Sequence, residues 1–347
     1  MPRKLIAEAQ EASKWRMPEE SDRHLRTWMA FGARREVWGR RLLPRVREDL
    51  AKVASAIAEF EPVTLCVRPN ERKLVEEYFE EGEDIEFFEV QLNDLWIRDY
   101  GAVFVVGSEG RQAAVDFNFN GWGEKQSFAS DANVAKLIAE KTQIQYMRSI
   151  LCLEGGGIEV DGQGTAIITE SCVLNRNRNP NWSKGQCEEE LQRVLGIEKV
   201  IWLPGVRGVD ITDGHTDFYA RFTGPGVVVA HLDLDRSSSD YRLTRQHLGI
   251  LQSARDAKGT KLKVITLESP KVVRPEFDSQ DFCAGYINFY VCNDAVIAPQ
   301  FGDRRADGKA KETLQELFPK REIVMLDIDG IAAGGGGIHC ATQQQPA

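Results

Sequence analysis

The sequence predicts a single α/β domain made of similar modules arranged around an axis. Strand-like runs alternate with amphipathic stretches at helical spacing, and five segments repeat one plan: a polar or glycine-rich approach, a strand, a tight turn and a second strand. The segments start roughly 50 to 70 residues apart, a spacing typical of blades or stacked modules. No low-complexity segment or linker interrupts this plan, so we expect residues 1–347 to form one domain.

Six helices are expected between the strands. The clearest runs from residue 44 to residue 60, where Val46, Leu50, Val53 and Ile57 recur at helical spacing. Pro44 fits the first turn of this helix, where a missing N–H costs nothing. Shorter helical patterns cover residues 70–78, 130–140, 186–195, 243–257 and 310–318.

The strands expected from the apolar runs are short. They cover residues 63–67, 102–106, 113–117, 166–169, 200–202, 227–230, 263–266, 289–292, 295–298 and 322–326. The five repeated segments begin at Asp99, Gly155, Gly214, Ala284 and Gly335. The fifth segment ends the chain without a second strand. We expect the early stretch 26–31 to pair with it and to close a ring.

Composition and charge exclude several classes of protein. The net charge is −9, with acidic and basic residues mixed along the chain, whereas a phosphate-binding surface needs clustered Lys and Arg. No nucleic-acid partner is therefore expected, and the acidity mildly favours small cationic molecules. No apolar run approaches the roughly 20 residues that span a bilayer. Residues 1–15 lack the apolar core of a signal peptide, so we expect a cytoplasmic protein without a membrane partner.

Neither the cysteines nor the histidines have the spacing of a metal site. The seven cysteines contain no CxxC pair, and the five histidines contain no HExxH pair. We therefore predict no metal ion and no cofactor. His24, His231, His247, His339 and every cysteine except Cys340 are interpreted as structural.

Ionisable residues lie at comparable places in four of the five modules, close to where each module's first strand begins. They are Asp99, Glu154, His215, Asp217 and Cys340. In a ring of modules these positions would converge on a central pocket. A single Cys and a distant His are a weak signal alone, but together with three carboxylates they indicate a reactive site.

This set of side chains suits a planar cation. Carboxylates hold a guanidinium through charge-assisted, bidentate hydrogen bonds. The guanidinium carbon is a poor electrophile, so it needs a thiolate, the strongest nucleophile among side chains. The substrate's own charge and a neighbouring imidazolium would favour the thiolate, and a histidine could pass protons to ammonia and from water.

Several motifs, spread almost end to end, carry a resemblance to a known family. They are Met17-Pro-Glu-Glu, Asn93-Asp-Leu-Trp-Ile-Arg-Asp-Tyr-Gly, Phe119-Asn-Gly-Trp-Gly-Glu-Lys, Leu153-Glu-Gly-Gly-Gly-Ile-Glu-Val-Asp-Gly, Thr212-Asp-Gly-His-Thr-Asp and Gly334-Gly-Gly-Gly-Ile-His-Cys-Ala-Thr-Gln-Gln-Gln-Pro. With these motifs the chain resembles the agmatine deiminase and bacterial-type peptidylarginine deiminase family of guanidino-modifying enzymes. The resemblance implies a five-bladed α/β propeller, the pentein fold, with pseudo-fivefold repeats around a central active site.

The resemblance also implies roles for individual residues. Cys340 matches the nucleophile, His215 the acid/base, and Asp99 with Asp217 the pair that grips the guanidinium, while Glu154 matches the carboxylate that supports His215. Substrate contacts are expected at Trp96, Trp122, Asp210 and Gly337. One position departs from the family: many agmatine deiminases carry an acid where this chain has Ile211, so the far ammonium of agmatine would be held differently.

The leading expectation is hydrolysis of agmatine to N-carbamoylputrescine and ammonia, a step toward putrescine and the polyamines, through an amidino-cysteine intermediate. The alternative within the same chemistry is a deiminase of free or peptidyl arginine that forms citrulline. A basic residue near the entrance (Arg98, Arg176, Arg178 or Arg207) would favour arginine, and a closed acidic pocket would favour agmatine. An amidinotransferase, a non-catalytic guanidine-binding protein and a homodimer remain open.

Overall fold

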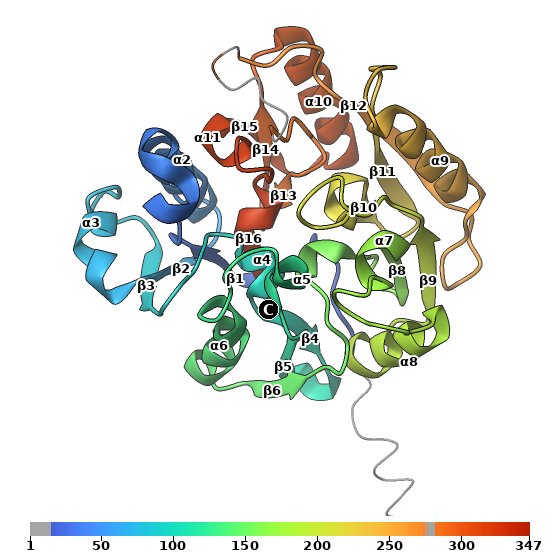
Figure 1. Cartoon of the computed structure of the whole chain (residues 1–347), viewed down its shortest axis with the longest axis horizontal. Coiled ribbons are helices and arrows are strands. Elements are labelled where there is room, and N and C mark those ends of the chain that lie inside the picture. Colours follow the sequence, from blue (N-terminus) through green and yellow to red (C-terminus); the bar gives the residue numbers. More distant parts are fainter. Residues whose placement is uncertain (1–14, 275, 277–281) are drawn as a thin grey trace, which may run out of the picture.

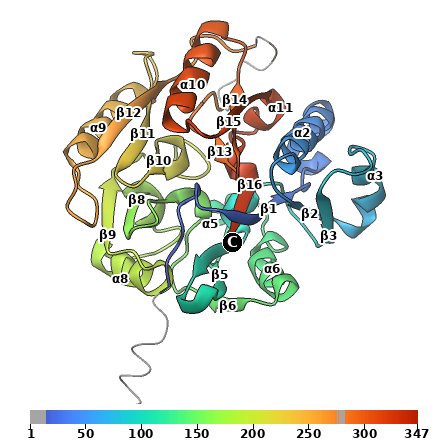
Figure 2. The same ribbon diagram turned by 180° about the vertical axis from the view of Figure 1, so that it is seen from behind.

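Five small sheets surround a common centre, as Figures 1 and 2 show from opposite sides. The computed structural model describes residues 15–274, 276 and 282–347. The first fourteen residues, which entered the argument against a signal peptide, lie outside the described part. The predicted α/β class and its fivefold repetition are confirmed.

Four of the sheets share one strand plan, an antiparallel hairpin followed by a third strand that pairs in parallel. Because the plan recurs, the start of each hairpin faces the same centre (Figure 1). The four sheets are β4 Val103–Val106, β5 Gln112–Asp116 and β6 Gln145–Arg148; β7 Ile158–Val160, β8 Thr165–Thr169 and β9 Lys199–Leu203; β10 Ala220–Gly224, β11 Val227–Leu232 and β12 Lys263–Glu268; β13 Tyr290–Val291, β14 Ala295–Gln300 and β15 Glu322–Asp327.

The fifth sheet joins the two ends of the chain. Its strand β16 (Thr342–Pro346) pairs antiparallel with β1 (His24–Ala30), with Thr27 opposite Gln344. Strands β2 (Val63–Val67) and β3 (Ile85–Glu89) follow in parallel. The prediction that an early strand completes the last hairpin is therefore confirmed. Figure 1 places the C-terminus at the centre of the ring.

The longer helices lie on the outside of the ring (Figure 1). They are α2 Arg35–Ala58, α3 Arg72–Glu76, α6 Val134–Thr142, α8 Lys184–Leu195, α9 Asp240–Ser253 and α10 Arg304–Leu317. Four single-turn helices accompany them: α4 Ile97–Tyr100, α5 Gly121–Glu124, α7 Glu170–Val173 and α11 Asp329–Ala332. All six predicted helices are present. α2 begins at Arg35, before Pro44, and is kinked at Gly39, whose φ of 65° is not helical.

The central strands of the sheets are buried on both faces, so the turns at their ends are held in fixed positions. Every residue of β2 and of β8 is buried, as expected for strands with parallel neighbours and helices outside them. The sequence did not predict β3 and β6, which are edge strands without a fully buried residue. No helix in the described ranges is both long and apolar enough to cross a bilayer.

Candidate active site

Tight turns at the start of the hairpins hold the predicted side chains. Asp99 lies in α4, and Glu154 directly precedes the 3-10 turn Gly155–Gly157. His215 and Asp217 flank the start of the 3-10 turn Thr216–Phe218, and Cys340 lies in the 3-10 turn His339–Ala341. All five are buried.

The remaining module also contributes, through Asn288, which lies two residues before β13. Its amide Nδ2 donates to Sγ of Cys340 over 3.4 Å, and the backbone N–H of Cys340 donates to its Oδ1, also over 3.4 Å. Sequence reasoning missed this residue because it searched for ionisable groups. Its position in the repeat, which corresponds to the positions of the ionisable residues in the other modules, is the signal that could have identified it.

The side chains converge around Gly156. A methyl group at this glycine would lie 2.7 Å from Nδ1 of His215, 2.8 Å from Oδ1 of Asp99 and 3.1 Å from Oδ2 of Asp217. Side chains from two modules therefore meet over a glycine of a third module, and a larger residue there would collide with them. The backbone N–H of Gly156 donates to Asp99 over 3.1 Å.

Asp99 and Cys340 line a cavity of about 200 Å³. Trp96 and Trp122, both predicted as substrate contacts, form part of its wall. Nε1 of Trp122 also donates to Oδ2 of Asp99 over 2.8 Å. The cavity is therefore walled by aromatic rings and contains a carboxylate and a thiol, which suits a flat cation on an aliphatic chain.

His215 lies between two carboxylates. Its Nδ1 is 3.6 Å from Oδ1 of Asp99, and its Nε2 is 3.2 Å from Oε2 of Glu154. Burial lowers the pKa of His215, but the charge of Asp99 and the hydrogen bonds with Cys172 and Glu154 outweigh it and raise the pKa well above the ordinary value. His215 is therefore an imidazolium at neutral pH and can donate a proton.

Glu154 is held ionised by a buried arginine that the sequence analysis did not assign to the site. Nε of Arg178 lies 2.8 and 3.0 Å from the two carboxylate oxygens of Glu154, and its Nη1 donates to Asp213 over 2.8 Å. Burial raises the pKa of Glu154, but Arg178 and His215 together bring it down to about 2. Glu154 thus keeps a negative charge beside the imidazolium.

The two aspartates differ in pKa. Burial raises the pKa of Asp99 to about 6, with Asp217 and Glu154 adding to the rise and His215 opposing it. Burial acts the same way on Asp217, but a hydrogen bond from His339 and the charge of His215 lower its pKa below the ordinary value. At neutral pH both are carboxylates, and each can accept from a guanidinium.

Cys340 is a neutral thiol in the free protein. Burial, then Asp217 and Asp99, raise its pKa well above the ordinary value, and the backbone N–H of Gly337 acts in the opposite direction. The thiol donates to Oδ2 of Asp217 over 3.6 Å. A bound guanidinium would cancel the carboxylate charges and so make the thiolate easier to form.

Two buried polar atoms of this cluster have no hydrogen-bond partner within the described part of the chain: Nδ1 of His215 and Oδ1 of Asp217. Buried polar atoms normally have partners, so orphan atoms beside a cavity need an explanation. Both would be satisfied by a ligand that donates and accepts hydrogen bonds at this point.

Two of the expected substrate contacts lie elsewhere. Oδ1 of Asp210 accepts from the backbone N–H groups of Thr212 and Gly214, so it shapes the turn before His215 and does not line the cavity. Gly337 packs against Asn288, whose Oδ1 would lie 2.4 Å from an added methyl group. Gly337 thus acts on the surroundings of the nucleophile and is not part of the cavity wall.

The arginines that would favour an amino-acid substrate do not line the cavity. Arg98 is buried against Glu20 and Gln344, and Arg178 against Glu154. Arg207 donates to a backbone carbonyl, and Arg176 is exposed. Among the described residues, the lining includes no Arg or Lys.

The cavity lining is apolar at Ile211, the position where the resemblance led us to expect an acid. Ile211, 38 % exposed, contributes to the lining beside Val37, Leu42 and Phe218. Lys125 reaches the same rim, but its Nζ is bound to Asp213 over 2.7 Å and to the carbonyl of Ile211.

A group of potential metal ligands lies beside the cavity. One ligand atom from each of Glu154, Cys172 and His215 falls within 4.8 Å of the others. The group does not fit a divalent cation well, because both oxygens of Glu154 already bind the guanidinium of Arg178 and His215 carries two protons. We therefore assign no ion to it.

Comparison with known proteins agrees with the arrangement. A family model described as Porphyromonas-type peptidyl-arginine deiminase matches residues 16–346. The agmatine deiminase of Pseudomonas aeruginosa (strain LESB58) is 37 % identical over 97 % of this chain and 96 % of its own, and that of Medicago truncatula is 36 % identical over 95 % and 96 %.

Solved structures show the same fold. The agmatine deiminase of Enterococcus faecalis superimposes with a TM-score of 0.88 at 34 % identity, covering 96 % of each chain. A variant agmatine deiminase of C. jejuni with substrate bound gives 0.85 at 27 % identity, covering 96 % of each chain. The Pseudomonas aeruginosa enzyme DDAH, at 14 % identity and a TM-score of 0.51, shares the pentein fold alone. The chain belongs to the Porphyromonas-type peptidyl-arginine deiminase family.

Proposed function

We propose that this chain is an agmatine deiminase, a hydrolase that converts agmatine and water to N-carbamoylputrescine and ammonia. The observation that carries the proposal is the meeting of Asp99, His215, Asp217 and Cys340 beside one cavity, in a chain whose relatives over nearly full length are agmatine deiminases. One catalytic domain spanning residues 1–347 is part of the proposal.

Binding orients the guanidinium for attack. Asp99 and Asp217 accept its N–H groups, and Oδ1 of Asp217 gains the partner that it lacks in the described part of the free protein. The bound cation offsets the charge of the two carboxylates, so the thiol of Cys340 loses its proton to water more readily. The N–H groups of Asn288 and Gly337 stabilise the resulting thiolate.

The first half-reaction releases ammonia. Sγ of Cys340 bonds to the guanidinium carbon, His215 protonates the departing nitrogen, and the C–N bond breaks as ammonia leaves. An amidino-thioether stays on the enzyme. Glu154 and Arg178 keep His215 charged and oriented for this step.

The second half-reaction uses the same groups in reverse. The neutral His215 takes a proton from water, the hydroxide adds to the amidino carbon, and the C–S bond breaks. The ureido product leaves, and the thiol is restored. Because water supplies both the oxygen and the proton, no cofactor enters the balance.

The lining of the cavity favours agmatine over free arginine. Free arginine carries a carboxylate that would need a cationic partner, and the described lining offers acidic and aromatic groups instead, among them Asp94 and Asp99. Peptidyl arginine lacks that free carboxylate, so the argument from the lining does not apply to it, and the assay below distinguishes it from agmatine. An amidinotransferase would need an amine in place of water, and a pure binding protein would not need the complete set of reacting groups.

A ureido assay with purified protein tests the proposal. Agmatine, arginine and a peptidyl-arginine are compared at equal concentration, with Cys340→Ala as the blank. We expect ureido product from agmatine alone or by far the most from it. Greater turnover of arginine or of the peptide would assign the activity to the alternative, and no turnover of any would leave the protein a binder.

Assembly and location complete the proposal. All seven cysteines are free, as in a reducing compartment, which supports the cytoplasm. A homodimer is proposed by the likeness to the family alone, and light scattering on the purified protein tests it.

A further inference from the structure

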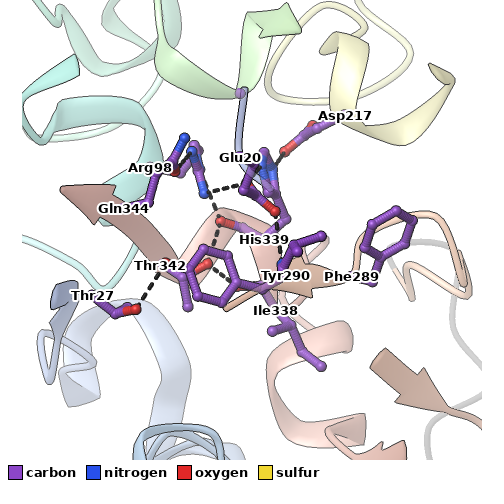
Figure 3. Close-up of polar contacts among 12 residues, drawn as sticks. Glu20, Thr27, Arg98, Asp217, Phe289, Tyr290, Ile338, His339, Thr342 and Gln344 are labelled. Carbon is purple, nitrogen blue, oxygen red and sulfur yellow. Dashed lines mark hydrogen bonds and ion pairs between the residues drawn. The ribbon is translucent and has the colours of Figure 1, made fainter. Parts of the chain in front are cut away.

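His339, next to the candidate nucleophile in the chain, connects Asp217 to the buried carboxylate of Glu20. Its Nδ1 lies 2.7 Å from Oδ2 of Asp217, and its Nε2 lies 2.9 Å from Oε2 of Glu20. Figure 3 shows the imidazole between the two acids. All three side chains are buried.

Glu20 is itself fixed from several sides. Its Oε1 accepts from Nη2 of Arg221 and from the backbone N–H of Val291, each over 2.8 Å, and its Oε2 accepts from Nη2 of Arg98 over 3.1 Å. Arg221 also binds Glu159. Arginines from two modules thus hold one carboxylate, so Glu20 is a rigid support for the imidazole.

The hydrogen-bond partners of Glu20 and Asp217 indicate how the imidazole of His339 is protonated. Glu20 already accepts from two guanidinium groups and a backbone N–H, whereas His339 and the weakly donating thiol of Cys340 are the donors to Oδ2 of Asp217. Both ring nitrogens face carboxylate oxygens, so each must donate a proton: Nε2 to Oε2 of Glu20 and Nδ1 to Oδ2 of Asp217. The hydrogen bond from Nδ1 holds Oδ2 in place and leaves Oδ1, which has no partner among the described residues, for the substrate.

We infer that His339, supported by Glu20, is a positioning residue that keeps Asp217 ionised and oriented toward the guanidinium. The inference rests on the proposed function, because the guanidinium is the ligand that Asp217 would meet. His339 touches no reacting atom and acts through Asp217.

The charges around the pair agree with this role. The hydrogen bond from His339 is the strongest of the effects that lower the pKa of Asp217, ahead of the charges of His339, His215 and Arg221. Burial, Arg221 and Arg98 lower the pKa of His339 itself, against the pull of Glu20 and Asp217. The ionisable groups that face the pair are Glu20, Arg98, Asp99, His215, Arg221, Cys283 and Cys340.

Two substitutions separate the functions of the two nitrogens. The amide of His339→Asn places an N–H near the position of Nδ1, so it keeps the donor to Asp217. The amide of His339→Gln reaches the position of Nε2, so it keeps the contact with Glu20 and loses the donor to Asp217. Each variant is compared with wild type in kcat/KM for agmatine between pH 5 and pH 9.

We expect kcat/KM of His339→Gln to fall by about ten- to a hundredfold at pH 7, the range for a lost hydrogen bond to a charged group. The acidic limb of the pH profile of kcat/KM for this variant should move to higher pH, because Asp217 then protonates more easily. His339→Asn should retain an acidic limb close to that of wild type. Glu20→Gln, which keeps the shape but loosens the support, should shift the limb in the same direction as His339→Gln by a smaller amount.

A buried histidine elsewhere serves as the matched control. His247 packs against Tyr219 on the inner side of α9 and accepts from the backbone N–H of Gly205, so His247→Gln should leave the limb unshifted. If His339→Gln and His339→Asn lose kcat/KM equally at every pH, and the acidic limb of neither pH profile shifts, the inference is overturned. Turnover of agmatine by the wild-type protein would still support the proposed function in that case. If His339→Gln does not fold, an unshifted limb in Glu20→Gln overturns it. Absence of wild-type turnover would instead reject the proposed function.

Discussion

Sγ of Cys340 lies 3.6 Å from Oδ2 of Asp217, so in the free protein the candidate nucleophile is hydrogen-bonded to one of the carboxylates proposed to bind the substrate. Burial and the neighbouring acids keep the thiol protonated in the free protein. The same acids bind a guanidinium, and the cation then favours the thiolate. Substrate binding and activation of the nucleophile are thereby coupled, and the thiol is protected from other electrophiles while the cavity is empty.

The pH dependence of kcat/KM should follow Asp99. Its pKa is raised to about 6, so the carboxyl takes up a proton as the pH falls through that value. The protonated group cannot pair with a guanidinium, and kcat/KM for agmatine should therefore decline below about pH 6. Initial rates across buffers of constant ionic strength measure the limb. A profile that stayed flat well below the pKa of Asp99 would contradict this assignment.

Replacing Asn288 should make the nucleophile harder to ionise. Asn288→Ala removes the Nδ2 donor that lies 3.4 Å from Sγ of Cys340, so the thiol pKa rises and kcat falls by about tenfold. The pH dependence of iodoacetamide labelling at Cys340, followed by peptide mass spectrometry, measures the change. Asn288→Asp should slow labelling further because it adds a negative charge. Faster labelling in either variant would refute the role of the amide.

Arg178 should matter for stability as well as for activity. Arg178→Ala leaves Glu154 and Asp213 without their buried cation, and removing one partner of a buried ion pair costs about 3–5 kcal/mol of unfolding free energy. Urea denaturation followed by circular dichroism measures the loss. Arg176→Ala, at an exposed neighbouring position, should change the free energy by less than about 0.5 kcal/mol. Equal effects of the two substitutions would contradict the buried pair.

An acid at the cavity mouth should improve binding of the far ammonium of agmatine. Ile211 is partly exposed on the lining, and an exposed ion pair contributes about 0.5–1 kcal/mol. Ile211→Glu should therefore lower KM for agmatine by about two- to fivefold. Butylguanidine has no ammonium group and serves as the control substrate, whose KM should not fall. A parallel drop for both substrates would show that charge is not the cause.

The sequence predicted the ring better than its outer edge. The repeated hairpins carry strong local signals, and even the pairing of β1 with β16 was expected from a missing strand. The edge strands β3 and β6 escaped detection because neither contains a fully buried residue, so neither shows the long apolar run by which the central strands were found. The start of α2 was misplaced because Pro44 was interpreted as part of the first turn, whereas α2 begins at Arg35 and is kinked at Gly39 before it reaches Pro44.

The reacting groups were predictable as residue types, and their surroundings were not. Cys340, His215 and the three acids stand out as ionisable residues at repeated positions. Asn288 carries no charge, and His339 was assigned to the structural residues although it donates to Asp217. Arg178 was considered only as a contact at the entrance, because nothing in the sequence places it against Glu154. Long-range pairing of this kind depends on the closed fold.

Rapid acid quenching followed by peptide mass spectrometry tests the covalent mechanism most directly. Protein mixed with agmatine is quenched at several times within one turnover. The account predicts an amidino group on the peptide that contains Cys340, together with a loss of turnover of more than about a thousandfold in Cys340→Ala. Ureido product formed at the normal rate by folded Cys340→Ala protein would contradict it.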